Sequence, residues 1–476
     1  MTNFSIEWMK AIQKTDRLLK MTKLTEQDRI VYFLKILLLK KILPHAGSGS
    51  PGPDRSDSFI LQSAGSISWD DLLKSAFDHA VQTGEKLDRA FEQITGHAPE
   101  LKETITGSKD FSFNDLNDTR QINNKIIKTV SDISIESDQI YGEIADYIIR
   151  TDFSLNKKYG FNLNPPFFAQ LMAGCINLEP GMKLYDIDCK DGKNFIECSK
   201  MMDTKNEDQN IQYFGFSQGP FESTICLLNL ALHNIPLSSV SLSTAKKKIS
   251  ELHEVMAYEK LSPCHRILGN YLSCLTRQTS KKDQIGSISE LIKLLTPDGM
   301  IAFILPQRML AGRQDAGDRT NLVKTDMIES VIHLPTSFSS CAGIDLYLVT
   351  IRAEKLLPTK NKILFIDLAD FFRYTSEKEI SSVRTVEIII KYRNFIMGLP
   401  DQTETVLSRF SRVVSTDDVE KSNFILTIQR YVAPPADQID IEEGFLELQI
   451  IQKRKEELKM EMDMCLKNVV KMMKGS

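Results

Sequence analysis

The sequence lacks the cysteine and histidine spacings that mark metal sites and disulfide frameworks. Eight cysteines occur among 476 residues, and no two of them form a C-x-x-C pair. Isolated cysteines are typical of reduced, buried thiols, so this pattern argues against a zinc site or a disulfide scaffold. The seven histidines show no spacing for metal binding or for a nucleophile–base pair. We therefore expect no metal site.

Long apolar runs and charge of one sign are also missing. The most apolar run, 30–43, is interrupted by three lysines and is too short to cross a bilayer. The start has no cationic stretch followed by a small-residue cleavage site, so we expect a cytoplasmic protein with no membrane partner. Lys and Arg total 59 against 63 Asp and Glu, for a formal net charge of -4. This balance excludes a simple basic wrap around nucleic acid and leaves a local basic face open.

The pattern of apolar residues changes twice along the chain. Residues 1–150 show helical spacing, notably over 5–43, 68–94 and 119–150, with a Ser cap at the start of 68–94 and a loop at 45–58 rich in Gly, Ser and Pro. From about 181, short apolar strands alternate with helices such as 220–234, which predicts an α/β fold with a doubly wound, mainly parallel sheet over 151–400. The predicted strands are 183–188, 211–216, 239–242, 265–270, 300–306, 330–335 and 345–352.

The third region, 401–476, contains a long predicted helix at 441–473, capped by Asp440 with Glu443 three residues later. Seven of its eight heptad a and d positions are apolar, with Lys455 the exception. Such a register favours a coiled-coil contact with a partner or between domains, and packing on its own domain is the alternative.

Several segments, in chain order, resemble the modification (M) subunit of type I restriction–modification systems. They include "EPGMKLYDIDCKDGKNF" (179–195), "GFSQGPFESTICLLNLALHNI" (215–235), "LTPDGMIAFILPQRML" (295–310) and "NFILTIQRYV" (423–432). The resemblance covers almost the whole chain. It implies a class I methyltransferase-like sheet, S-adenosylmethionine as cofactor, amino methylation of adenine, and double-stranded DNA and a specificity-type subunit as partners, with self-association through the C-terminal helix an alternative.

The cofactor positions implied by the resemblance depart from the family pattern. Asp186 keeps the carboxylate at the end of the first strand, and Gly192 is the one glycine left in the turn, where Lys190 and Lys193 replace two others. Ser217 takes the place of the acidic residue that would bind the ribose hydroxyls. Thr244 takes the place of the acidic residue after the third strand. We therefore expect S-adenosylmethionine to bind weakly or not at all.

The target-base loop of the family, Asn-Pro-Pro-Tyr/Phe, belongs at the end of the fourth strand. That position holds Asn270 and Tyr271, followed by Leu272 and Ser273, without either proline. The tetrapeptide itself occurs earlier, at 164–167. We interpret it as a helix start, with Asn164 as N-cap and Pro165 as the first helical residue; a catalytic or cofactor role for Asn164 is the alternative.

Three functional hypotheses follow. The first is a DNA-associated scaffold of the M-subunit type that is defective in methyl transfer, contacting phosphates through Lys281, Lys282, Arg308 and Arg313. The second is an active adenine methyltransferase with an atypical pocket. The third is a protein-interaction module without DNA binding.

Overall fold

The computed structural model describes residues 3–43, 67–78, 82–97, 101, 112–114, 120–151, 163–202, 210–217, 219–243, 263–270, 286–335, 344–375, 382–400, 405–432 and 455–456. The chain divides into two compact units, 1–432 and 433–476. In the second unit only Lys455 and Glu456 are described, and both are helical. The coiled-coil prediction for 441–473 and the predicted loop at 45–58 lie outside the described residues, and the predicted domain boundaries at 150 and 400 stay predictions.

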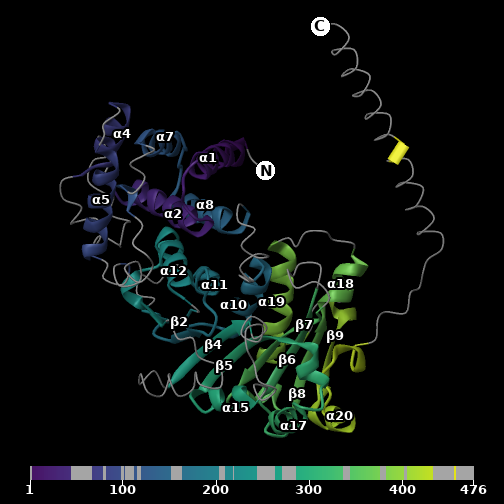
Figure 1. Ribbon diagram of the computed structural model, residues 1–476. Coiled ribbons are helices and arrows are strands. Elements are labelled where there is room, and N and C mark those ends of the chain that lie inside the picture. Colours follow the sequence, from purple (N-terminus) through teal and green to yellow (C-terminus); the bar gives the residue numbers. More distant parts are fainter. Residues whose placement is uncertain are drawn as a thin grey trace. The chain divides into compact units, whose positions relative to one another are not determined.

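The first part of unit 1 is helical, as the spacing predicts (Figure 1). Two of the helices begin with a capping box, α2 at Thr25 and α4 at Ser68. In each, the cap hydroxyl accepts from the backbone three residues on, and the Asp there accepts in return. The helices are α1 (Asn3–Lys20), α2 (Glu26–Ile42), α4 (Trp69–Phe77), α5 (Thr83–His97), α7 (Arg120–Ser131) and α8 (Asp138–Thr151).

A nine-stranded sheet follows, with strand order β3-β2-β1-β4-β5-β7-β6-β8-β9. All seven predicted strands are present, and the prediction missed β8 and β9. The strands are β1 (Lys183–Asp186), β2 (Gln212–Phe216), β3 (Val240–Ser243), β4 (Cys264–Asn270), β5 (Leu295–Pro306), β6 (Ile328–Leu334), β7 (Leu346–Arg352), β8 (Lys362–Asp367) and β9 (Ser411–Ser415). Strands β1 to β5 are parallel, β7 runs against β5 and β6, and β9 runs against β8.

Helices cover both faces of the sheet, which confirms the doubly wound architecture. Along β5, Met300, Ala302 and Ile304 join one apolar cluster while Ile301 and Phe303 join the other, because successive strand residues point to opposite faces. The first cluster also holds residues of α10 (Pro166–Ile176), α11 (Lys193–Met201), α12 (Pro220–Leu232), α18 (Leu368–Tyr374) and α19 (Ser382–Met397). The second holds residues of α15 (Gly286–Ile292), α17 (Ala316–Lys324) and α20 (Thr416–Lys421).

The helical region is joined to the sheet region without a gap in the core. Apolar residues of α1 to α8 belong to the same buried cluster as those of α10, α12 and β5. At the end of α2, the Lys41 ammonium donates to the carbonyls of Ala231 and Leu232, at 2.8 and 3.0 Å, and so completes the last turn of α12. The two regions therefore share one hydrophobic core.

Among the described residues, no helix is long and apolar enough to span a bilayer.

Candidate functional site

The candidate site is formed where parallel strands end at one edge of the sheet. Strand β1 ends at Asp186, β2 at Phe216, and β4 at Asn270. Ligands of doubly wound sheets bind at this carboxyl edge, near the point where the strand order reverses. Here the order reverses between β1 and β4, so the residues after these two strands are the ones to examine.

The turn after β1 is held by buried carboxylates. Asp186 is fully buried; it accepts from the Asp188 backbone N–H at 3.0 Å and from Asn194 Nδ2 at 2.8 Å. Burial raises the pKa of Asp186 to about 7, and the nearby charge of Asp188 adds to this, although both hydrogen bonds oppose it. Asp186 therefore sits at the predicted place, but its carboxylate is already bonded within the turn.

Lys190, one of the two lysines that the resemblance aligns with glycines of the family, lies inside this turn. Its backbone has a φ of 34°, in the left-handed region that glycine adopts more readily than any side-chain-bearing residue. Its side chain is 5% exposed, and Nζ lies 3.0 Å from Asp188 Oδ2. Lys190 therefore combines a left-handed backbone conformation with a buried ion pair.

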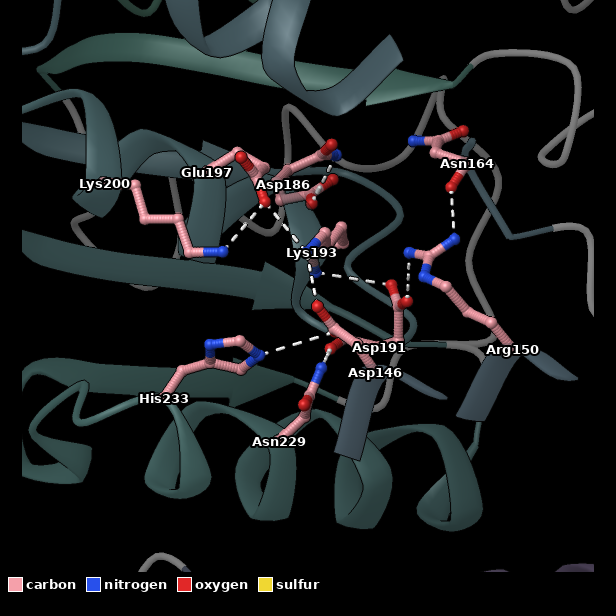
Figure 2. Close-up of polar contacts among 11 residues, drawn as sticks. Asp146, Arg150, Asn164, Asp186, Asp191, Lys193, Glu197, Lys200, Asn229 and His233 are labelled. Atoms are coloured by element: carbon pink, nitrogen blue, oxygen red, sulfur yellow. Dashed lines mark hydrogen bonds and ion pairs between the residues drawn. The ribbon is translucent and has the colours of Figure 1, made fainter. Parts of the chain in front are cut away.

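Lys193, the other lysine, opens α11 and binds two carboxylates. Its Nζ lies 2.6 Å from Asp146 Oδ2 on α8 and 2.8 Å from Glu197 Oε1 one turn later (Figure 2). Burial alone would lower the pKa of Lys193, but these two negative charges outweigh it and raise the pKa. Burial likewise opposes ionisation of Asp146, yet His233, with its Nε2 3.5 Å from Asp146 Oδ1, and the charge of Lys193 hold the pKa of Asp146 below its usual range.

Gly192, the remaining glycine, is required by both conformation and space. Its φ is 73°, and an added Cβ would lie 3.0 Å from Leu230 Cδ2 and 3.1 Å from Cys226 Sγ. The turn is therefore pressed against α12. Asn229 of the same helix donates to the Asp191 carbonyl at 2.8 Å (Figure 2), which fixes the turn from that side.

Ser217 follows β2, at the position that the resemblance assigns to the ribose acid. Its backbone N–H donates to the Ser243 carbonyl of β3 at 3.0 Å, and its hydroxyl is hydrogen-bonded to the hydroxyl of Ser223 in α12. Position 217 therefore presents a hydroxyl that is already bonded to Ser223, and it has no carboxylate that could accept from ribose hydroxyls. Thr244 lies outside the described residues.

The "NPPF" tetrapeptide lies beside the end of β4. Asn270 Nδ2 donates to Asn164 Oδ1 at 2.8 Å, and both residues are buried. Helix α10 begins at Pro166 with Pro165 at the N-cap position, and no side chain caps it. The prediction that Asn164 caps this helix and Pro165 opens it was therefore wrong, because the Asn164 side chain bonds to Asn270 across the fold.

The acceptor oxygens of the tetrapeptide are used within the fold. Arg150 Nη1 donates to the Asn164 carbonyl at 2.8 Å, and Phe168 N donates to the Pro165 carbonyl at 2.9 Å. Phe167 is 6% exposed and packs edge to face against Phe372, with ring centroids 5.8 Å apart. These two carbonyls and this ring are therefore bonded and packed within the fold.

Arg150 connects the turn and the tetrapeptide. Its Nη2 binds Asp191 Oδ2 at 2.8 Å, while Nη1 holds Asn164 (Figure 2). A continuous polar chain thus runs from Asp191 through Arg150 and Asn164 to Asn270. The sequence did not indicate Arg150, Asp146 or His233, because they come from helices read only as packing elements.

The remaining predicted site residues divide between exposed and undescribed positions. Arg308, in the last turn of α16 (Gln307–Ala311), and Arg313, just beyond it, are both exposed near the carboxyl end of β5. Tyr271, Lys281 and Lys282 lie outside the described residues. Within the part of the chain that the structure describes, no group of three or more His, Cys, Asp or Glu side chains could hold a metal ion.

The strand order β3-β2-β1-β4-β5-β7-β6, with polar side chains gathered at the carboxyl ends of β1, β2 and β4, is that of a class I methyltransferase-like protein. The family model described as "N-6 DNA Methylase" matches residues 136–440, more than half of the chain, and the chain belongs to this family. The resemblance to type I M subunits is thereby confirmed. The type I restriction enzyme MjaIX methylase subunit of Methanocaldococcus jannaschii is 22% identical over 422 residues, covering 83% of this chain and 73% of the relative.

Solved structures of two M subunits share the fold. The type I restriction–modification methyltransferase subunit of Streptococcus thermophilus gives a TM-score of 0.66 at 15% identity, covering 90% of this chain and all of that one. A modification subunit of a putative type I restriction enzyme from Vibrio vulnificus gives 0.57 at 12% identity, covering 88% and 94%.

Proposed function

We propose that this chain is an M-type subunit that associates with DNA and has lost methyl transfer, so that it works as a scaffold. The observation that carries the proposal is the buried Lys190–Asp188 ion pair in the turn that would pass along the cofactor. With Ser217 bonded to Ser223 where a ribose carboxylate is needed, these residues do not fit S-adenosylmethionine as the family holds it.

The state of the base slot supports the same proposal. Asn270 is retained at the end of β4, but its amide donates to Asn164, and the proline turn that should follow it is absent from the sequence. A flipped adenine needs acceptors for its amino group and an aromatic face to stack on. In the tetrapeptide, the main-chain carbonyls of Asn164 and Pro165 accept hydrogen bonds within the fold, and the Phe167 ring packs on Phe372.

Contact with DNA would come from the exposed basic residues after β5. Arg308 and Arg313 lie near the carboxyl end of that strand, and Lys281 and Lys282 follow β4 in the sequence. Arginine and lysine side chains that neutralise phosphates give binding that weakens with salt. A specificity-type subunit, held through 441–473, would supply the sequence recognition that these contacts lack.

Titration calorimetry with S-adenosylmethionine tests the proposal. We expect no binding by the natural chain at ligand concentrations up to about 1 mM, whereas a working enzyme of this family would bind in the micromolar range. Micromolar binding, or transfer of labelled methyl groups to adenine in duplex DNA, would overturn the proposal in favour of an active enzyme with an atypical pocket.

A designed variant tests the residue assignment. Lys190→Gly alone would remove the ion-pair partner of the buried Asp188, so the variant should combine Asp188→Ala, Lys190→Gly and Ser217→Glu. We expect this triple variant to gain measurable cofactor binding. If it folds, by circular dichroism, and still shows no binding, the assignment of these positions is wrong.

Duplex titration at two salt concentrations, with and without a specificity-type subunit, tests the DNA part. Affinity that falls steeply with salt supports it. Absence of salt-dependent affinity in both cases would leave the chain as a protein-interaction module.

A further inference from the structure

Helix α8 presents two charged side chains to the turn that follows β1. Asp146 and Arg150 are four residues apart, so they lie on one face of the helix. Asp146 Oδ2 lies 2.6 Å from Lys193 Nζ. Arg150 Nη2 lies 2.8 Å from Asp191 Oδ2, so the two ion pairs stand on either side of Gly192 (Figure 2). The helix is therefore tied to the turn both before and after its glycine.

The backbone of this turn has a conformation that needs support from its neighbours. Lys190 and Gly192 both have positive φ, of 34° and 73°, and the left-handed region is unfavourable for a lysine. Asp191 lies between them and is fixed from two helices. Arg150 of α8 holds its Oδ2 atom, and Asn229 of α12 donates to its carbonyl at 2.8 Å. The turn is thus kept in place by side chains of its own chain.

The second arm of the Arg150 guanidinium holds the tetrapeptide. Nη1 donates to the main-chain carbonyl of Asn164 at 2.8 Å, and the Asn164 side chain accepts from Asn270 at the end of β4. A guanidinium presents its N–H groups in one rigid plane, so a movement of one arm moves the other. One side chain therefore links the turn after β1 to the segment that opens α10 (Figure 2).

We propose that Arg150 is a latch that closes the carboxyl edge of the sheet and makes the turn and the tetrapeptide open together. Since Arg150 lies in the last turn of α8, a movement of that helix end releases both segments. A ligand that needs the Asp191 carboxylate or the Asn164 carbonyl has to displace the guanidinium first. Its apparent affinity is therefore reduced by the fraction of molecules in which the latch is open. This inference does not depend on whether the chain methylates DNA.

Hydrogen exchange of the full chain, followed by mass spectrometry, tests the latch. Arg150→Met removes both contacts of the guanidinium. We expect the backbone amides of 187–195 and those of 167–172 to exchange about tenfold faster or more, because local opening of both segments becomes easier. The amides of 300–306 in β5 report on the whole fold and should keep the rate of the natural chain.

Two isosteric variants distinguish the latch from a general loosening of the turn. Asp191→Asn removes the charge that holds Nη2 of Arg150. We expect it to speed exchange over 167–172 as well as over 187–195, although Asp191 itself belongs to the turn. Asp146→Asn is the matched control, because it removes the charge that holds Lys193 and leaves both arms of Arg150 in place. It should speed exchange over 187–195 only.

Three results would overturn the proposal. The first is unchanged exchange in either segment of Arg150→Met, and the second is an Asp191→Asn variant that loosens the turn without the tetrapeptide. The third is an Asp146→Asn variant that loosens both segments, since the coupling would then not pass through Arg150. If Arg150→Met also lost the protection of β5, that variant would be unfolded, and the two asparagine variants would decide between a latch and independent segments.

Discussion

Asn164 and Asn270 are 106 positions apart in the chain, yet they are joined side chain to side chain by a buried hydrogen bond of 2.8 Å. One belongs to a tetrapeptide that looks catalytic, and the other to the strand end where catalysis would take place. The bond therefore fixes the orientation of both amide side chains at the carboxyl end of β4.

This bond predicts a measurable coupling. Asn164→Ala removes one buried hydrogen bond of the Asn270 amide, so we expect a loss of about 1–3 kcal/mol in the free energy of unfolding. Asn270→Ala should cost a similar amount, and the double variant should cost about 1 kcal/mol less than the sum. Urea unfolding of the four chains gives the cycle. Additive losses would mean that the bond contributes nothing.

The buried ammonium of Lys193 should matter much more for stability than an exposed one. Lys193→Met leaves Asp146 and Glu197 without their shared partner, and breaking a buried pair costs about 3–5 kcal/mol. Lys293→Met removes an exposed pair with Glu290 and should cost less than about 1 kcal/mol. The urea midpoints of the two variants compare them directly, and equal shifts would contradict the burial argument.

Gly192 offers a test of close packing. Gly192→Ala combines a positive φ with crowding against Leu230 and Cys226, whereas Gly181→Ala has a φ of 81° and nothing within 4 Å of the new Cβ. We expect the second to cost about 1 kcal/mol from conformation alone, and the first to cost about 1–3 kcal/mol more. Thermal melts distinguish them, and equal losses would show that the turn can move away from α12.

Asp186 should make stability depend on pH. Its pKa is raised in the folded chain to about 7, so between about pH 4 and 7 the folded state holds a proton that the unfolded state has released. Its contribution therefore becomes less favourable as pH rises through that window and is constant above it. Asp186→Asn removes the charge, and the new amide can donate to Asn194 Oδ1, which has no hydrogen-bond partner among the residues that the structure describes.

The measurement is the unfolding free energy of both chains at pH 5 and pH 8. From pH 5 to pH 8, the unfolding free energy of the natural chain should fall relative to that of the Asp186→Asn variant. A difference that is the same at both values would show that Asp186 titrates normally.

The exposed arginines after β5 should contribute to DNA binding through charge. Arg308→Ala and Arg313→Ala should each lower the slope of log affinity against log salt by about 0.9, independently of DNA sequence. Lys293→Ala, which lies just before β5 at the opposite edge of the sheet, is the control and should leave the slope unchanged. Unchanged slopes for both arginine variants would place the DNA elsewhere.

The sequence was most informative where structure is local. Seven strands and the Pro220 start of α12 could be read from apolar runs and helix signals. Of the missed strands, β9 is an edge strand in which only Val414 is buried, so its pattern carries little signal, whereas β8 has a readable apolar run that the prediction omitted. The site was less predictable. The sequence could place Asp186 at the end of β1 and Gly192 in the turn that follows it. It could not predict that Arg150 reaches Asp191 across 41 residues, because no local pattern records such a contact.

The Lys190–Asp188 pair also bears on how this chain can change over generations. Replacing either residue alone removes the ion-pair partner of the other and should give a less stable protein. A glycine at position 190 would thus be best tolerated together with a neutral residue at position 188. The ion pair therefore couples the two positions, so that substitutions in this turn should be made at both together.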